Sequence, residues 1–354
     1  MTTGAEKSSL KGTRHSRSLK VVFIFALGTS ALAGNISTSN LLNAMIKIDN
    51  LTKYYGPTLA VDSVSFEITR SQVVGFLGPN GAGKTTTMRM VTCYLKPTAG
   101  TASVAGYDIL DSPLEVRRRL GYLPENCPLY NEMNVVEYLH YIAELHQVPK
   151  SERTRKVKEM IGIVRLGDVV YKDIGELSRG YRQRVGLAQA MVHDPDILIL
   201  DEPTNGLDPN QIIEMRQLIK EIGREKTILI STHIMQEVTA TCGRVLIISD
   251  GRLVAQGSPD ELISQAQGKE AATISLKGNE EDIYAGLREA RFIEGFKKKG
   301  SEDEGEWLTL EVQSTSGDIR EQLFRLAVEK NWSLRELRTE RISLEEVFAR
   351  ITTS

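Results

Sequence analysis

The stretch GPNGAGKTT at residues 78–86 constrains the fold of this chain more than any other part of its sequence. It follows Val73–Leu77, an apolar run without helical period that is typical of a buried strand. The stretch itself matches G-x-x-x-x-G-K-[ST], the pattern of a phosphate-binding loop. A glycine-rich turn without a ligand is the alternative, and the strand before the loop and the helix expected over Thr86–Cys93 argue against it.

Each residue type in the loop suits a bound nucleoside triphosphate. Glycines allow unusual dihedrals, so that backbone N–H groups approach phosphate closely. Lys84 supplies a charge to the β- and γ-phosphates, and the Thr85 hydroxyl is a ligand for Mg²⁺. We therefore expect the whole loop to bind nucleotide: Gly78, Pro79, Asn80, Gly81, Ala82, Gly83, Lys84, Thr85 and Thr86.

Two further apolar runs end in polar residues that suit phosphate chemistry. Ile197–Leu200 leads into Asp201 and Glu202, and we expect this strand to lie beside the phosphate-loop strand. Asp201 would hold Mg²⁺ through water, and Glu202 would polarise the water that attacks the γ-phosphate. The run Thr227–Thr232 ends at His233, where open α/β sheets place their ligands. A neutral imidazole there could donate to the γ-phosphate and hold the attacking water.

A second anion site is predicted in the segment LSRGYRQR. Ser178 is a suitable N-cap for a helix over Tyr181–Met191, and free N–H groups at a helix start bind anions. Two phosphate-binding helix starts in one chain suggest a sandwich, in which the second site of one copy covers the nucleotide held by another.

These motifs, in this order, resemble the ATP-binding subunit of an ABC transporter over about residues 45–265. GPNGAGKTT resembles the Walker A loop, ILILDEP Walker B, and LSRGYRQR the signature motif. The resemblance implies that Tyr55 stacks on adenine and that Ser178 and Gly180 contact the γ-phosphate. It also implies a Q-loop position at Glu125 facing Mg²⁺, a D-loop in NGLD with Asp208, and His233 as the switch histidine.

Two departures from the family pattern stand out. Arg179 and Tyr181 occupy the positions of Gly and Gln in the usual LSGGQ signature, and Glu125 replaces the usual Gln. We interpret the first as subfamily variation. The YLPE form around Glu125 resembles single-cassette exporter ATPases of the drug, polysaccharide and gliding-motility type.

The predicted fold class is α/β, with a P-loop NTPase ABC cassette over 45–265 and a small α+β ferredoxin-like domain over 270–354. The cassette is expected to combine a mixed sheet with a helical subdomain at about 112–195, containing helices over Val135–His146 and Arg153–Val164. The C-terminal region is expected to follow the order β-α-β-β-α-β, with Lys297–Glu306 as a charged turn. A closing helix over Ser343–Ile351 resembles the tail of the same exporters, and Ser343 with Glu346 fits a capping box.

Residues 1–44 form a separate, signal-like extension. Basic residues precede the apolar run VVFIFALGTSALAG at 21–34, which is the layout of a secretory signal. Three interpretations are open: a true signal peptide, a membrane-surface anchor, or sequence upstream of a start at Met45. The last is favoured, because the family resemblance begins at Met45 and a cleaved signal would send the ATPase to where ATP is scarce.

The remaining sequence features limit which partners and which cellular location we expect. The net charge of −2 gives no reason to expect nucleic acid as a partner. The three cysteines, Cys93, Cys127 and Cys242, show neither metal spacing nor a disulfide framework. The resemblance implies ATP and Mg²⁺ as cofactors, transmembrane permease subunits and a second copy of the chain as partners, and a peripheral location at the cytoplasmic face of the membrane.

The competing hypothesis is a non-transport ABC ATPase that acts on ribosomes or DNA. Ribosome-acting relatives usually carry two cassettes in one chain, and this chain has one. DNA-repair relatives insert a long coiled coil between Walker A and the signature, whereas about 90 residues without heptads separate Lys84 from Ser178 here.

Overall fold

The computed structural model describes residues 44–266, 271–302, 306–315, 317–340 and 346–349. The signal-like extension lies outside these residues except for Ala44. Most of the predicted closing helix, including Ser343 of its capping box, also lies outside them.

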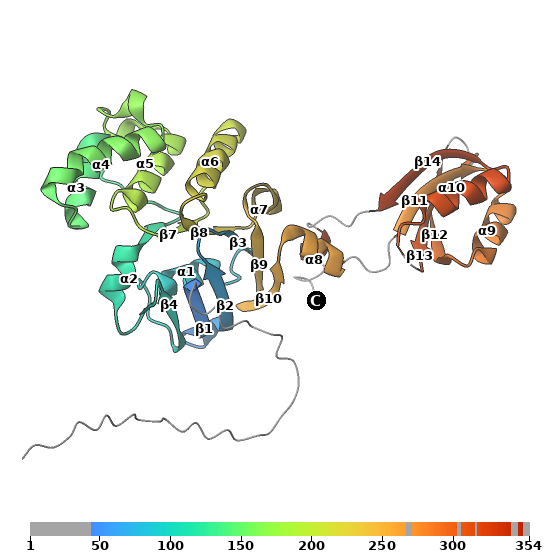
Figure 1. The fold of residues 1–354 in the computed structure, drawn as a ribbon, viewed down its shortest axis with the longest axis horizontal. Helices are drawn as coiled ribbons and strands as arrows, with labels where there is room; N and C mark the ends of the chain where they lie inside the picture. Colours follow the sequence, from blue (N-terminus) through green and yellow to red (C-terminus); the bar gives the residue numbers. More distant parts are fainter. Residues whose placement is uncertain (1–43, 267–270, 303–305, 316, 341–345, 350–354) are drawn as a thin grey trace, which may run out of the picture. The chain divides into compact units, whose positions relative to one another are not determined.

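A six-stranded sheet forms the centre of the cassette (Figure 1). Its order is β10-β9-β3-β8-β7-β6, and every neighbouring pair is parallel except β10 with β9. Strands β7 and β8 are buried along their whole length, as expected for parallel strands covered on both faces. The six strands are β3 (Val73–Leu77), β6 (Leu120–Leu123), β7 (Ile197–Asp201), β8 (Thr227–Thr232), β9 (Arg244–Ser249) and β10 (Arg252–Gly257).

The expectation that the acid-bearing strand lies beside the phosphate-loop strand is wrong. Strand β8 lies between β3 and β7 and pairs with both. An apolar run predicts that a strand is buried, but it carries no information on which strand is its neighbour. The chemistry is unaffected, because the carboxyl ends of parallel strands meet at one edge of the sheet.

A second, antiparallel sheet has the order β2-β1-β4-β5, with β1 (Ala44–Tyr55), β2 (Thr58–Thr69), β4 (Ala99–Val104) and β5 (Tyr107–Asp108). Successive residues of β7 point to opposite faces of the central sheet. Ile197 and Ile199 join the core beneath the antiparallel sheet, whereas Leu198 and Leu200 join the core beneath the helices. The cassette therefore has two apolar cores, one on each face of the central sheet.

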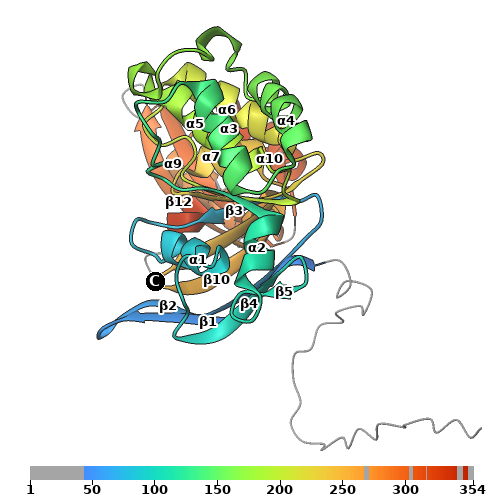
Figure 2. The ribbon, with the colours of Figure 1, turned by 90° about the vertical axis from the view of Figure 1, so that its left-hand side faces the viewer.

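Helices α3 (Val135–Leu145), α4 (Lys150–Ile163) and α5 (Arg179–Met191) gather into one group (Figures 1 and 2). Their positions confirm the three helices expected in this region. Strand β6 and α2 (Pro113–Arg119) also fall within the range predicted for the helical subdomain, yet β6 pairs with β7 in the central sheet. The other cassette elements are α1 (Lys84–Val91), the short 3-10 turns Gly167–Val169 and Ile174–Glu176, α6 (Pro209–Ile222), α7 (Met235–Thr241) and α8 (Pro259–Ala266).

The C-terminal elements are β11 (Ala271–Lys277), α9 (Glu280–Glu289), β12 (Ile293–Glu302), β13 (Trp307–Ser314), α10 (Arg320–Glu329) and β14 (Ser333–Glu340). Their sheet has the order β12-β13-β11-β14 and is antiparallel throughout. Alternate residues of β11 and β13 pack with apolar residues of both helices in a separate core. This is the β-α-β-β-α-β arrangement expected for a ferredoxin-like sandwich.

The predicted charged turn over Lys297–Glu306 is wrong in its first half. Strand β12 continues to Glu302 at the edge of the sheet. Lys298 lies 2.9 Å from Glu280, and Lys299 lies 3.5 Å from Glu311 on β13. These pairs satisfy the charges, and lysines are common on edge strands because they oppose pairing with another chain. Among the residues that the structure describes, no helix is long and apolar enough to cross a bilayer.

Candidate nucleotide site

The phosphate loop joins the end of β3 to the start of α1, and two of its glycines are sterically required. A Cβ on Gly78 would lie 2.5 Å from the Ile248 carbonyl oxygen. Gly83 has φ of +100°, and a Cβ there would lie 2.5 Å from the Ala60 carbonyl oxygen. Gly83 is also the N-cap of α1 and offers no capping side chain, so the first N–H groups of the helix are left for an anion.

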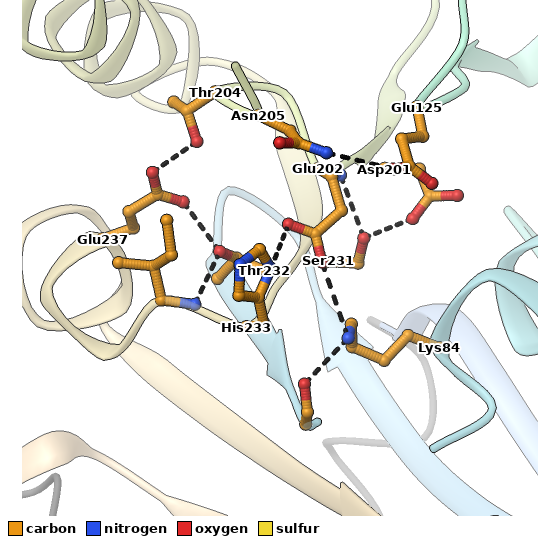
Figure 3. A network of polar contacts seen from close by, with 12 residues as sticks. Lys84, Glu125, Asp201, Glu202, Thr204, Asn205, Ser231, Thr232, His233 and Glu237 are labelled. Atoms are coloured by element: carbon orange, nitrogen blue, oxygen red, sulfur yellow. Dashed lines mark hydrogen bonds and ion pairs between the residues drawn. The ribbon is translucent and has the colours of Figure 1, made fainter. Parts of the chain in front are cut away.

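Lys84 is held at the floor of this loop with its side chain 6% exposed. Its ammonium donates to the carbonyl oxygens of Gly78 at 2.8 Å and Pro79 at 3.2 Å. It also lies 3.5 Å from the Glu202 carboxylate (Figure 3). A phosphate entering the loop therefore competes with these three partners for the cation.

Asp201 ends β7 and is fully buried. Its Oδ1 accepts hydrogen bonds from the hydroxyls of Thr85, at 3.2 Å, and Ser231. Its Oδ2 is buried and has no hydrogen-bond partner within the described part of the chain. Burial, with a contribution from the Asp201 charge, raises the pKa of the neighbouring Tyr122 to about 12, so that phenol stays protonated near neutral pH.

Glu202 adopts a left-handed backbone conformation with φ of +50°. Such a conformation costs a non-glycine residue about 1–2 kcal/mol and often marks a functional position. Its N–H donates to both the carbonyl and the hydroxyl of Ser231, each at 3.1 Å, which holds this turn. Its carboxylate lies between the Lys84 ammonium, 3.5 Å away, and the Nδ1 atom of His233, 3.0 Å away. Glu202 and His233, predicted from two separate strands, thus meet at one edge of the sheet.

A cleft of about 320 Å³ opens above these residues. Nine predicted site residues line it: Asn80, Gly81, Gly83, Lys84, Thr85, Thr86, Glu125, Glu202 and His233. Ala60 and Asn205 also line it; neither was a predicted site residue, although Asn205 begins the NGLD motif. Asn205 donates to the Glu125 carboxylate at 3.0 Å. Its position three residues after Glu202 is a sequence feature that could have predicted it. Ser231 could have been predicted in the same way, because its hydroxyl stands inside an apolar run. Nothing in the sequence marks Ala60.

The other predicted residues lie elsewhere. Gly78, Pro79 and Ala82 belong to the loop but do not line the cleft, and Asp201 lies beneath it. Tyr55, at the end of β1, is 47% exposed and outside the cleft lining, with the Lys53 ammonium 5.5 Å from its ring centroid.

Ser178, Gly180 and Asp208 also lie outside the cleft lining and form a second set. Ser178 caps α5 by accepting the Tyr181 N–H at 3.5 Å, which confirms the predicted cap. Asp208 caps α6, accepting the N–H of Gln211 at 3.0 Å. Gly180 packs against the Gln211 side chain, so the starts of α5 and α6 lie side by side. We call this surface the α5–α6 face.

Comparison with known proteins decides the family. The family described as ABC transporter matches residues 61–205. The ABC transporter ATP-binding protein YxlF of Bacillus subtilis (strain 168) is 37% identical over 249 residues, which are 70% of this chain and 81% of the relative. This chain belongs to the ATP-binding proteins of ABC transporters.

Two further ABC proteins support the same fold. The bacitracin transport ATP-binding protein BcrA of Bacillus licheniformis is 39% identical over 223 residues, covering 62% of this chain and 72% of the relative. The dimeric structure of MJ0796, a bacterial ABC transporter cassette, is 25% identical with a TM-score of 0.56, covering 60% of this chain and 98% of that one. The chain is therefore an ATP-binding ABC cassette and an ATP hydrolase of this family.

Proposed function

We propose that this cassette is the motor subunit of an exporter, in which two copies bind two Mg-ATP head to tail and drive separate membrane subunits. The main support is the separation of the two predicted phosphate-binding sets. Lys84, Glu202 and His233 line the cleft, whereas Ser178 and Gly180 belong to the α5–α6 face. If both sets contact one triphosphate, a second copy must supply the α5–α6 face. Among the similar proteins, the MJ0796 cassette is described as dimeric and BcrA as a bacitracin transport protein, which supports a dimer and a role in transport.

The residues around Asp201 suit Mg²⁺. A buried carboxylate oxygen without a partner is costly unless a cation satisfies it, and Asp201 Oδ2 is such an oxygen. The Thr85 hydroxyl, 3.2 Å from Oδ1 of the same carboxylate, is a second oxygen ligand, and Glu125 lines the same cleft. Bound there, Mg²⁺ would neutralise charge on the triphosphate.

The other residues take roles that follow from their positions. Lys84 exchanges its loop carbonyls and Glu202 for phosphate oxygens. Glu202, released from Lys84, accepts a proton from the attacking water, and His233 orients that water and the γ-phosphate. Catalysis then rests on positioning and on charge stabilisation.

Residues outside the cleft take part in binding. Tyr55, which is 47% exposed, stacks on the adenine. Ser178, Gly180 and Asp208 act from the second copy. The cassette would lie peripherally at the cytoplasmic face of the membrane and pass its motion to transmembrane permease subunits.

Mixing two inactive variants tests the head-to-tail arrangement. Lys84→Ala removes the phosphate-loop charge, and Ser178→Arg blocks the α5–α6 face. Each variant alone should hydrolyse little ATP. A mixed dimer contains one site with an intact Lys84 from one chain and an intact Ser178 from the other, so mixing should restore phosphate release. Mixtures that stay inactive, although both variants are folded, would contradict the proposal.

A further inference from the structure

A buried carboxylate outside the nucleotide cleft joins the two turns that carry the reactive side chains. Glu237 lies in α7, four residues after His233, and is 5% exposed. It accepts hydrogen bonds from the hydroxyls of Thr204 and, at 2.7 Å, Thr232 (Figure 3). Burying a carboxylate is unfavourable unless such donors satisfy it, so the two hydroxyls are what allow a carboxylate at this buried position.

The two threonines belong to the turns that carry the proposed catalytic pair. Thr204 lies two residues after Glu202, and Thr232 immediately precedes His233. The Thr232 hydroxyl, which donates to Glu237, also accepts the Ile234 N–H at 3.1 Å. The residues on both sides of His233 are thereby fixed to the same carboxylate that fixes the turn after Glu202.

Helix α6 supplies the charge partner. Arg216 of α6 lies 3.7 Å from the Glu237 carboxylate, and its side chain is 23% exposed. The same helix begins at the Asp208 cap on the α5–α6 face. Glu237 therefore contacts the Glu202 turn, the His233 turn and α6.

We infer that Glu237 is a positioning residue for ATP hydrolysis, whose carboxylate keeps the Glu202 and His233 turns in one arrangement. The inference rests on the proposed roles of those two residues. Thr204 and Thr232 both donate, so both oxygens of residue 237 must accept. A glutamine has only one acceptor atom, so one of the two hydroxyls would have to rotate and accept from its NH₂ group, and the negative charge 3.7 Å from Arg216 would be lost.

Steady-state hydrolysis of ATP by four variants tests this. Glu237→Gln and Thr204→Val should each lower kcat about tenfold, the effect of losing about 1.4 kcal/mol of positioning, with KM for ATP within about twofold of wild type. Thr204→Ser keeps the hydroxyl and should retain the wild-type kcat. Val238→Ala is the matched control: it removes buried packing from the same helix without touching the hydrogen bonds, and should lower the unfolding midpoint while leaving kcat unchanged.

Hydrogen exchange gives a second readout that needs no turnover. In Glu237→Gln, the amides of residues 204–207 and 232–236 should exchange faster together, and in Val238→Ala they should not. The inference is overturned if kcat is unchanged, if KM rises in proportion to the loss of kcat, or if only one segment exchanges faster. Should Glu202→Gln leave turnover intact, the proposed function fails, and the exchange experiment still decides whether Glu237 links the turns.

Discussion

Replacing Glu202 with Gln should slow hydrolysis without weakening ATP binding. The carboxylate lies 3.5 Å from the Lys84 ammonium, and both side chains are at most 7% exposed. In the structure, therefore, Glu202 is paired with the Lys84 ammonium, the cation that the triphosphate needs. The substitution removes this competitor and also a negative charge beside the phosphates.

The size of each effect follows from these contacts. A hydrogen bond to a charged partner contributes about 1.5–3 kcal/mol, and the long 3.5 Å separation places this pair at or below the lower end. ATP should therefore bind as tightly as to wild type, or up to about tenfold more tightly. Loss of a general base should slow hydrolysis by about 10²–10⁴-fold, or about 3–5 kcal/mol in the barrier.

The assay pairs a fluorescent-nucleotide titration with single-turnover phosphate release. Glu125→Gln is a matched control, because Glu125 lines the same cleft but contacts neither Lys84 nor His233, and Gln can still accept from Asn205. It should change hydrolysis by less than about tenfold. Unchanged phosphate release in Glu202→Gln would refute the general-base role. Weaker ATP binding in that variant would refute the competition for Lys84.

Three other predictions concern binding, stability and the chain's start. Lys84→Ala should weaken ATP binding by about 1.5–3 kcal/mol in the same titration, and unchanged affinity would count against the loop's role. Burial, and the charge of the stacked His146, lower the pKa of His193 from 6.5 to about 4. Between these pH values the unfolded chain binds a proton that the folded chain does not, so the free energy of unfolding should fall as pH falls from 6.5 to 4. The contribution is at most about 3.4 kcal/mol, and urea unfolding at pH 7 and 4.5 should show a smaller loss of unfolding free energy in His193→Asn; an equal loss would contradict the role of His193. Mass spectrometry of the native protein should give a mature N-terminus at Met45, and peptides from residues 12–44 would contradict that start.

Local chemistry made much of the site predictable. The phosphate loop, the acidic pair after β7 and the histidine after β8 are short segments in which residue type and strand position carry the signal. The structure brings Lys84, Glu202 and His233 together as those segments predict. The Ser178 cap was equally local, since a side chain and an N–H three residues later form it.

The features that were missed depend on distant parts of the chain. The position of β8 between β3 and β7 depends on packing that no single run encodes. Strand β12 extends through Lys297–Lys299 because Glu280 and Glu311, from other elements, pair with two of those lysines. Glu237 was overlooked because a glutamate in a short helix resembles a solvated residue, and only the fold shows that Thr204 and Thr232 surround it.

The central claim is that ATP joins two copies of this cassette, and the mass of the Glu202→Gln variant in solution tests it most directly. Light scattering during size exclusion should give the mass of a dimer with Mg-ATP and of a monomer with Mg-ADP. Adding Ser178→Arg to the same variant should abolish the dimer without abolishing ATP binding. A monomer at saturating Mg-ATP would contradict the account.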